Sequence, residues 1–134
     1  MLEFALVIPI FVFVLYGLIA FGIMLSGKQT MTNAASEGAR AAVGAVPNVG
    51  ESQSAAEVRV AKARVDQALQ GQLSGNYTSS MTTASVAQCT NTSGNCITVK
   101  VTYPYSSKPL IPTAPGLGLV MPNTISATAV VEVP

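Results

Sequence analysis

The sequence predicts an α+β fold, with a long apolar N-terminal helix followed by a small domain that holds a second helix and a short antiparallel β-sheet. Three observations predict it. Residues 4–27 are 24 consecutive uncharged residues. Helical spacing of small and apolar residues continues over residues 29–46 and returns over 54–70. Two segments nearer the C-terminal end alternate apolar and polar residues, as half-buried strands do.

The uncharged run is long enough to cross a membrane. At 1.5 Å per residue its 24 residues make about 36 Å of helix, against about 30 Å for the hydrocarbon core of a bilayer. Glu3 precedes the run and Lys28 closes it. Pro9 removes one backbone donor and is expected to loosen the first turns. The run therefore predicts at least a single-pass membrane anchor.

The helix is expected to continue to about Val46, because the break signal Pro47–Gly50 follows. We accordingly divide the chain into a transmembrane or filament-core helix, residues 1–46, and an extracytoplasmic head, residues 47–134.

Small residues recur at every fourth position along this helix. Such rows let helix backbones approach one another closely. Beyond Lys28 the alternative is a helix that packs only on its own head. The residues of the two rows are Gly22 and Ser26 in the apolar run, and Ala34, Gly38 and Ala42 after it.

The charges around the apolar run are inverted relative to the positive-inside rule if the head lies outside the cytoplasm. No basic residue precedes the run, and the first flanking cation, Lys28, is on the head side. We therefore expect that a basic leader preceded Met1 and was removed.

Glu3 has two interpretations. A carboxylate in the first turn of a helix is favoured by the helix dipole, by about 0.3–1 kcal/mol. If many such helices pack side by side, the α-ammonium of a neighbouring subunit would pair with Glu3, and an unpaired acid in a dry helical core would be costly. In that case Glu3 sets the axial register of assembly.

The second helix is predicted over residues 54–70. Ser54 and Glu57 have the spacing of a capping box. An apolar stripe runs along one face, formed by Val58, Ala61, Val65, Ala68 and Leu69. The basic residues Arg59, Lys62 and Arg64 alternate with acids, which favours a solvated face over contact with lipid headgroups or nucleic acid.

Residues 97–105 and 125–133 alternate in the manner of strands, and residues 78–89 are a weaker candidate. Cys89 and Cys96 flank a turn between the first two strands. The sequence has no further Cys or His to complete a metal site, so a disulfide or two free thiols remain. A disulfide would place the head in an oxidising compartment.

A proline-rich segment separates the last two strands, and its apolar residues are Leu110, Ile111, Leu117, Leu119, Val120 and Met121. Because it contains four prolines, this segment cannot be regular helix or strand along its whole length. An apolar loop of this length either covers its own sheet or contacts a partner.

Composition argues against several functions. A net charge of +1 does not make a nucleic-acid footprint. Histidine is absent, and no acid pair, nucleophile motif or phosphate loop occurs, so we expect neither an enzyme nor a cofactor or metal site.

The N-terminal third resembles TadE-like proteins, which are pilin-like subunits of tight-adherence (type IVc) pilus systems. The resemblance covers about 43 residues, from LEFALVIPIF to EGARAAV. Its most specific positions are Glu3 with Phe4, Pro9, the YGLIAFG stretch Tyr16–Gly22, and TNAASEGARAAV, Thr32–Val43. In that family the acid usually lies slightly deeper from the leader cleavage site than third. The later ITVKVTYPY and ISATAVVEV fit the family's β-rich ending more loosely.

The resemblance implies a non-enzymatic structural subunit. It would be made with a basic leader cut by a prepilin peptidase, anchored in the bacterial inner membrane, and assembled through its N-terminal helix into an extracellular pilus. Its partners would be copies of itself, other pilus subunits, the assembly machinery and membrane lipid. Two alternatives remain, a minor pilin or assembly factor at the membrane or filament tip, and a membrane-anchored extracytoplasmic binding module.

Overall fold

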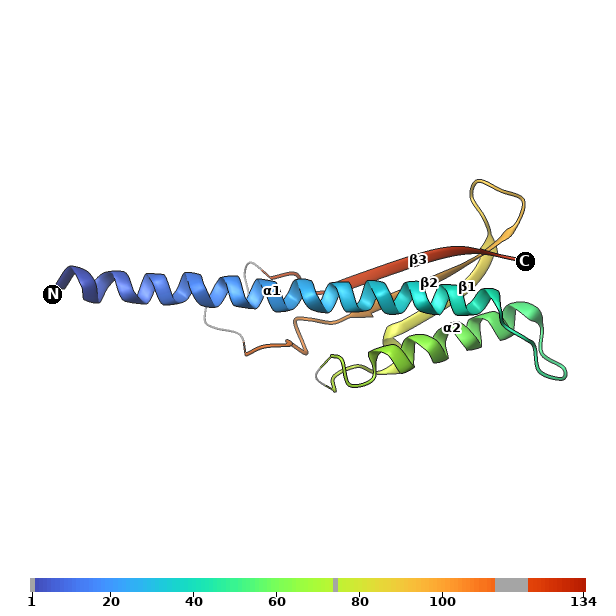
Figure 1. The fold of residues 1–134 in the computed structure, drawn as a ribbon, viewed down its shortest axis with the longest axis horizontal. Helices are drawn as coiled ribbons and strands as arrows, with labels where there is room; N and C mark the ends of the chain where they lie inside the picture. The colour runs from blue at the N-terminus through green and yellow to red at the C-terminus, as the bar shows by residue number, and fades with distance from the viewer. Residues whose placement is uncertain (1, 74, 113–120) are drawn as a thin grey trace.

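A computed structural model describes residues 2–73, 75–112 and 121–134, and it has the predicted α+β fold (Figure 1). The helices are α1 (Leu2–Val43), α2 (Gln53–Leu69) and the one-turn 3₁₀ helix η1 (Ser79–Met81). The strands are β1 (Thr82–Gln88), β2 (Asn95–Tyr103) and β3 (Ile125–Val133). They form one antiparallel sheet in the order β1-β2-β3.

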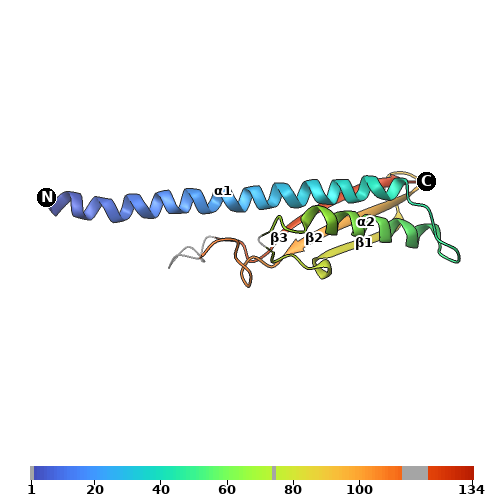
Figure 2. The ribbon, with the colours of Figure 1, turned by 60° about the horizontal axis from the view of Figure 1, so that its bottom comes forward.

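One face of the sheet is covered by the two long helices. The C-terminal part of α1 lies along β2 and β3, while α2 lies mainly along β1 (Figures 1 and 2). The predicted alternation is confirmed most clearly in β2, where Ile97, Val99, Val101 and Tyr103 are fully buried. The residues between them face away from the helices and are exposed or half-buried.

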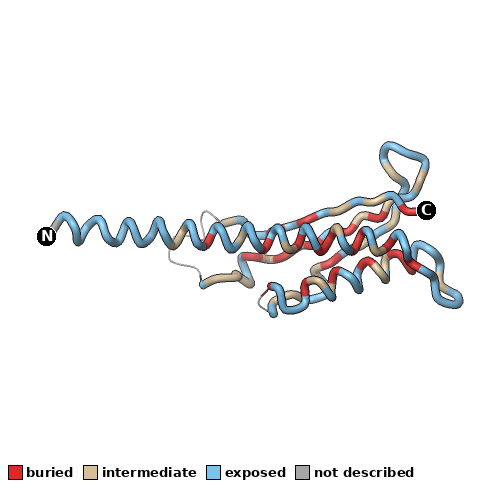
Figure 3. The backbone as a smooth tube through the Cα atoms, viewed as in Figure 1, coloured by how far each residue is buried: buried red, intermediate tan, exposed pale blue. Residues whose placement is uncertain are grey.

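The core of the head includes the second half of α1. Met31, Ala34, Ala35, Ala39 and Ala42 are almost completely buried, whereas the first half of the helix is exposed on nearly all sides (Figure 3). Small side chains on this stretch allow α1 to lie close to both α2 and the sheet. The division of the chain at residue 46 stays a prediction.

Both helix boundaries near the α1–α2 connection differ from those expected. α1 ends at Val43, earlier than Val46, and the Ala45 N–H donates to the Ala42 carbonyl at 3.0 Å in a tight turn. A helical backbone at Val46 is also disfavoured because Pro47 follows it.

The predicted capping box of Ser54 and Glu57 is wrong. Ser52 is the N-cap of α2, and its hydroxyl accepts a hydrogen bond from the Ala55 N–H at 3.3 Å. Glu57 is buried instead, and its carboxylate accepts a hydrogen bond from the Gln53 side chain at 3.1 Å.

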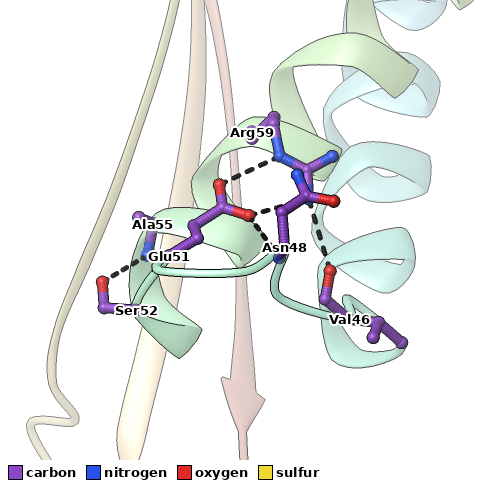
Figure 4. A network of polar contacts seen from close by, with 6 residues as sticks. All are labelled: Val46, Asn48, Glu51, Ser52, Ala55 and Arg59. Carbon is purple, nitrogen blue, oxygen red and sulfur yellow. Dashed lines mark hydrogen bonds and ion pairs between the residues drawn. The ribbon is translucent and has the colours of Figure 1, made fainter.

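An ion pair explains this start of α2 (Figure 4). The Glu51 carboxylate accepts from Nε and Nη2 of Arg59 at 3.0 and 3.1 Å, and from the Asn48 N–H at 2.9 Å. Arg59 Nη2 also donates to the Val46 carbonyl at 3.3 Å. Hydrogen bonding from Arg59 is the main reason that the pKa of Glu51 lies below its usual range. These bonds close the connection directly before Ser52, the N-cap, and α2 begins at Gln53.

A second polar cluster ties the end of α2 to the sheet. The Tyr77 hydroxyl donates to the Asp66 carboxylate on α2 and lies 2.6 Å from the Thr82 hydroxyl at the start of β1. Burial, together with the hydrogen bond to Asp66, raises the pKa of Tyr77 to about 12.

We expect Tyr77→Phe to lower the free energy of unfolding by about 1 kcal/mol at neutral pH, the low end for a hydrogen bond to a charged group, because Tyr77 is partly exposed. The folded pKa, about 12, lies above the ordinary value of 10. The contribution is therefore complete below about pH 10 and is lost as pH rises through 12.

Chemical unfolding of the full chain in detergent micelles checks this prediction. The difference between wild type and Tyr77→Phe should shrink between about pH 10 and pH 12. Ser80→Ala, which removes an exposed hydroxyl nearby, should show no such trend. A difference for Tyr77→Phe that is independent of pH would contradict the role of its ionisation.

Candidate functional site

The first half of α1 is the candidate site, because it is an apolar surface that the chain leaves uncovered. Large apolar side chains occupy all its sides, and Phe4 and Leu18 are 72% and 65% exposed. The helix is long and apolar enough to cross a membrane. In its most apolar 18-residue window only 6% is buried, whereas the core helix of a soluble protein is mostly buried.

Glu3 lies in the first turn of α1 and is exposed. Within the described part of the chain it forms no ion pair. The end of the helix that carries it is also the end farthest from the head (Figure 1). No cation of the head is therefore placed to pair with Glu3 in the described part of the chain.

The two rows of small residues have different surroundings. At Gly38 a Cβ would lie 2.5 Å from Cγ2 of Val65 and 2.9 Å from the Ala61 carbonyl oxygen on α2. Ala34 and Ala42 are buried in the same core. This row packs within the chain, which is the alternative left open for the part beyond Lys28.

In contrast, Gly22 and Ser26 are exposed, and a Cβ at Gly22 would meet nothing within 4 Å. Among the described residues, no helix packs against Gly22. This row therefore stays a candidate for packing between subunits.

The apolar loop between β2 and β3 is described only in part. Leu110 and Met121 are half-buried and pack against the core, and Ile111 is half-buried. Leu117, Leu119 and Val120 lie outside the described residues. The loop also contacts α1, because the Tyr16 hydroxyl donates to the Pro112 carbonyl.

Tyr16 is a site residue that the sequence argument missed. A signal was present, since a tyrosine inside an apolar run carries a hydroxyl that needs a partner when it leaves water. The partner, Pro112, is 96 residues away in the chain, and no local pattern points to it.

Cys89 and Cys96 form a disulfide, with their Cα atoms 5.0 Å apart. It closes the hairpin between β1 and β2, where the Cys89 N–H also donates to the Gly94 carbonyl at 2.9 Å. The hairpin lies at the end of the sheet away from the N-terminus of α1 (Figure 1).

Replacing both cysteines by serine should destabilise the head and leave the apolar helix unaffected. The loop-closure model gives about 2–3 kcal/mol for a ring of this size. Thermal unfolding of the full chain in micelles, with and without the substitutions, measures the change. Two thiols that react with an alkylating agent under denaturing, non-reducing conditions would contradict the disulfide.

The remaining charged groups do not form a second site. Among the described residues no three metal-ligating side chains cluster. Arg59 is paired with Glu51, and Arg64 donates to the Gln67 side chain at 2.9 Å, so the basic residues of α2 lie on a solvated face. The geometry gives no positive indication of catalysis.

Comparison with known protein families gives a match on the segment that contains the apolar helix. Neither curated proteins nor solved structures give a significant match. The family model of TadE-like proteins matches residues 1–40, so the resemblance is confirmed over that segment and indicates a pilus-associated protein with an apolar N-terminal helix.

Proposed function

We propose that the chain is a structural, pilin-like subunit that is held in the inner membrane by the first half of α1 and then packs through the same surface into an extracellular filament. The head would lie on the extracytoplasmic side before assembly and on the outside of the filament after it. Both states cover an apolar surface that a single chain in water would leave exposed.

The observation that carries this proposal is the position of the family match. It covers residues 1–40, which include the whole exposed apolar half of α1 and the small residues that join it to the head. The exposed half has the properties that both environments require. It is long enough for a bilayer, and its Gly22–Ser26 row offers a close approach to another helix.

Analysis of sheared surface filaments tests the proposal. Cells that express an epitope-tagged chain would be sheared, and the filaments purified away from membranes. We expect the chain to be the repeating component of the filaments, and deleting its gene should remove them. Cells that make normal filaments without the chain would overturn a structural role.

The stoichiometry in the same filaments separates the alternatives. A few copies per filament would favour the minor pilin or assembly factor. A chain confined to the membrane fraction, with filaments unaffected by its deletion, would favour an anchored binding module.

A further inference from the structure

The loop after β2 reaches back beside the middle of α1. Leu110 lies against Gly27, where a Cβ would be only 2.9 Å from Cδ1 of Leu110. Further towards the N-terminus, the Tyr16 hydroxyl donates to the Pro112 carbonyl. In Figures 1 and 2 this part of the loop extends from the head towards the N-terminal half of the helix.

These contacts conflict with a membrane that touches α1 alone. If the loop stayed outside the bilayer, only the helix from Glu3 to Tyr16 would be left to cross it. Those 14 residues span about 20 Å, whereas the hydrocarbon core is about 30 Å thick. To cross the core, α1 must be immersed to about Ile23. The loop therefore enters the membrane together with the helix, or its contact with Tyr16 breaks.

The charges of the two segments favour entry. Lys28 ends the uncharged run of α1. Lys108 is the last charged residue before the loop, and the next charged residue in the sequence is Glu132. Lys28 follows Gly27, and Lys108 lies two residues before Leu110, which contacts Gly27, so both lysines are close in sequence to this contact. Lys108 is half-buried, and its Nζ donates to the Asn76 carbonyl at 3.5 Å. Two segments distant in sequence thus lose their charges close to the same contact, as expected at the edge of a hydrocarbon core.

Unpaired N–H and C=O groups are costly in hydrocarbon, and two features of the segment reduce this cost. Pro109 and Pro112 have no N–H to satisfy. The carbonyl of Pro112 is paired with Tyr16, and the carbonyl of Lys108 accepts from the Tyr103 hydroxyl at 2.8 Å.

We propose that the segment Pro109–Pro112 enters the head-side leaflet beside α1, so that Leu110 and Ile111 contact lipid acyl chains and Lys28 lies among the headgroups. This inference rests on the membrane anchoring of α1 in the proposed function. Before assembly, the loop would contact lipid, and the membrane anchor would consist of two segments, α1 and Pro109–Pro112, rather than α1 alone.

Tryptophan fluorescence tests it directly, because the chain contains no tryptophan. The full chain, with a single Ile111→Trp substitution, would be placed in vesicles of brominated phosphatidylcholine at high lipid excess. Bromine quenches an indole only on close contact. We expect a blue-shifted emission and a loss of fluorescence of the same order as for Phe13→Trp, which reports on α1 itself. Val130→Trp, on the exposed face of β3, should not be quenched.

The variants distinguish the possible failures. Pro112→Trp, at an exposed position one residue further, covers the case in which Ile111→Trp disturbs the fold. Quenching of Phe13→Trp without quenching of either loop variant would overturn the inference and leave the anchor intact. Absence of quenching at Phe13 would overturn the anchor as well. A blue-shifted but unquenched loop tryptophan would mean that protein, such as a neighbouring subunit, covers the loop, and would also overturn lipid contact.

Discussion

Glu3→Gln is expected to abolish filament assembly while membrane insertion, the fold of the head and the Cys89–Cys96 bond remain normal. Glutamine keeps the shape and a hydrogen-bonding group but removes the charge. Leaving one member of a buried charge pair unpaired typically costs about 3–5 kcal/mol. If Glu3 sets the register of assembly, that cost recurs at every contact between subunits, because each copy would then pair its Glu3 with a neighbour's α-ammonium.

Filament yield and length, compared at equal amounts of membrane-inserted protein, measure this effect. Glu37→Gln is the matched control, because it removes an exposed acid from the same helix at the level of the head. It should leave filaments unchanged. Filaments of normal yield and length from Glu3→Gln would show that the charge does not set the register, and Glu3 would then be only an acid favoured by the helix dipole.

Gly38→Val should produce a large loss of stability in the head. The ideal Cβ position lies 2.9 Å from the backbone carbonyl oxygen of Ala61 and 2.5 Å from the Val65 side chain. Val65 could change rotamer, but the Ala61 backbone cannot move without separating α1 from α2. Overpacking of this kind typically costs about 1–3 kcal/mol or more, and each kcal/mol lowers Tm by roughly 4–8 °C in a domain of this size.

Gly22→Val is the counterpart on the same helix. A Cβ at Gly22 meets nothing within 4 Å, so thermal unfolding of the head in micelles should be unchanged by this substitution. If Gly22 packs against a neighbouring helix, filament yield should fall instead. Equal Tm losses from both variants would contradict the different surroundings of the two rows.

The secondary structure of the head could be predicted from its sequence because its signals are local. Alternation in ITVKVTYPY and ISATAVVEV predicted β2 and β3, and the apolar stripe of α2 predicted the buried Ala61, Val65 and Leu69. The start of α2 could not be placed in the same way. Both Ser52 and Ser54 can act as a helix cap, and only the structure shows that Ser52 is the N-cap, beside the Glu51–Arg59 pair.

The sequence alone determined the apolar run from Phe4 to Gly27 and its length. It also showed two cysteines close enough in the chain for a disulfide that closes a short loop. Each depends on residues that are neighbours in the chain. Only the tertiary structure decided which half of the long helix packs into the core of the head and which half stays exposed. Gly38 is a small residue like Gly22, and only the approach of α2 makes one a core position and leaves the other exposed.

The same holds for the loop. Leu110 and Pro112 acquire a place along α1 only because the sheet returns the chain to Gly27 and Tyr16. Periodicity and composition report which residues avoid water. Which of them meet one another depends on contacts between segments about 80 to 100 residues apart, and chain closure over that distance is specified by the packing of the whole core rather than by any local pattern.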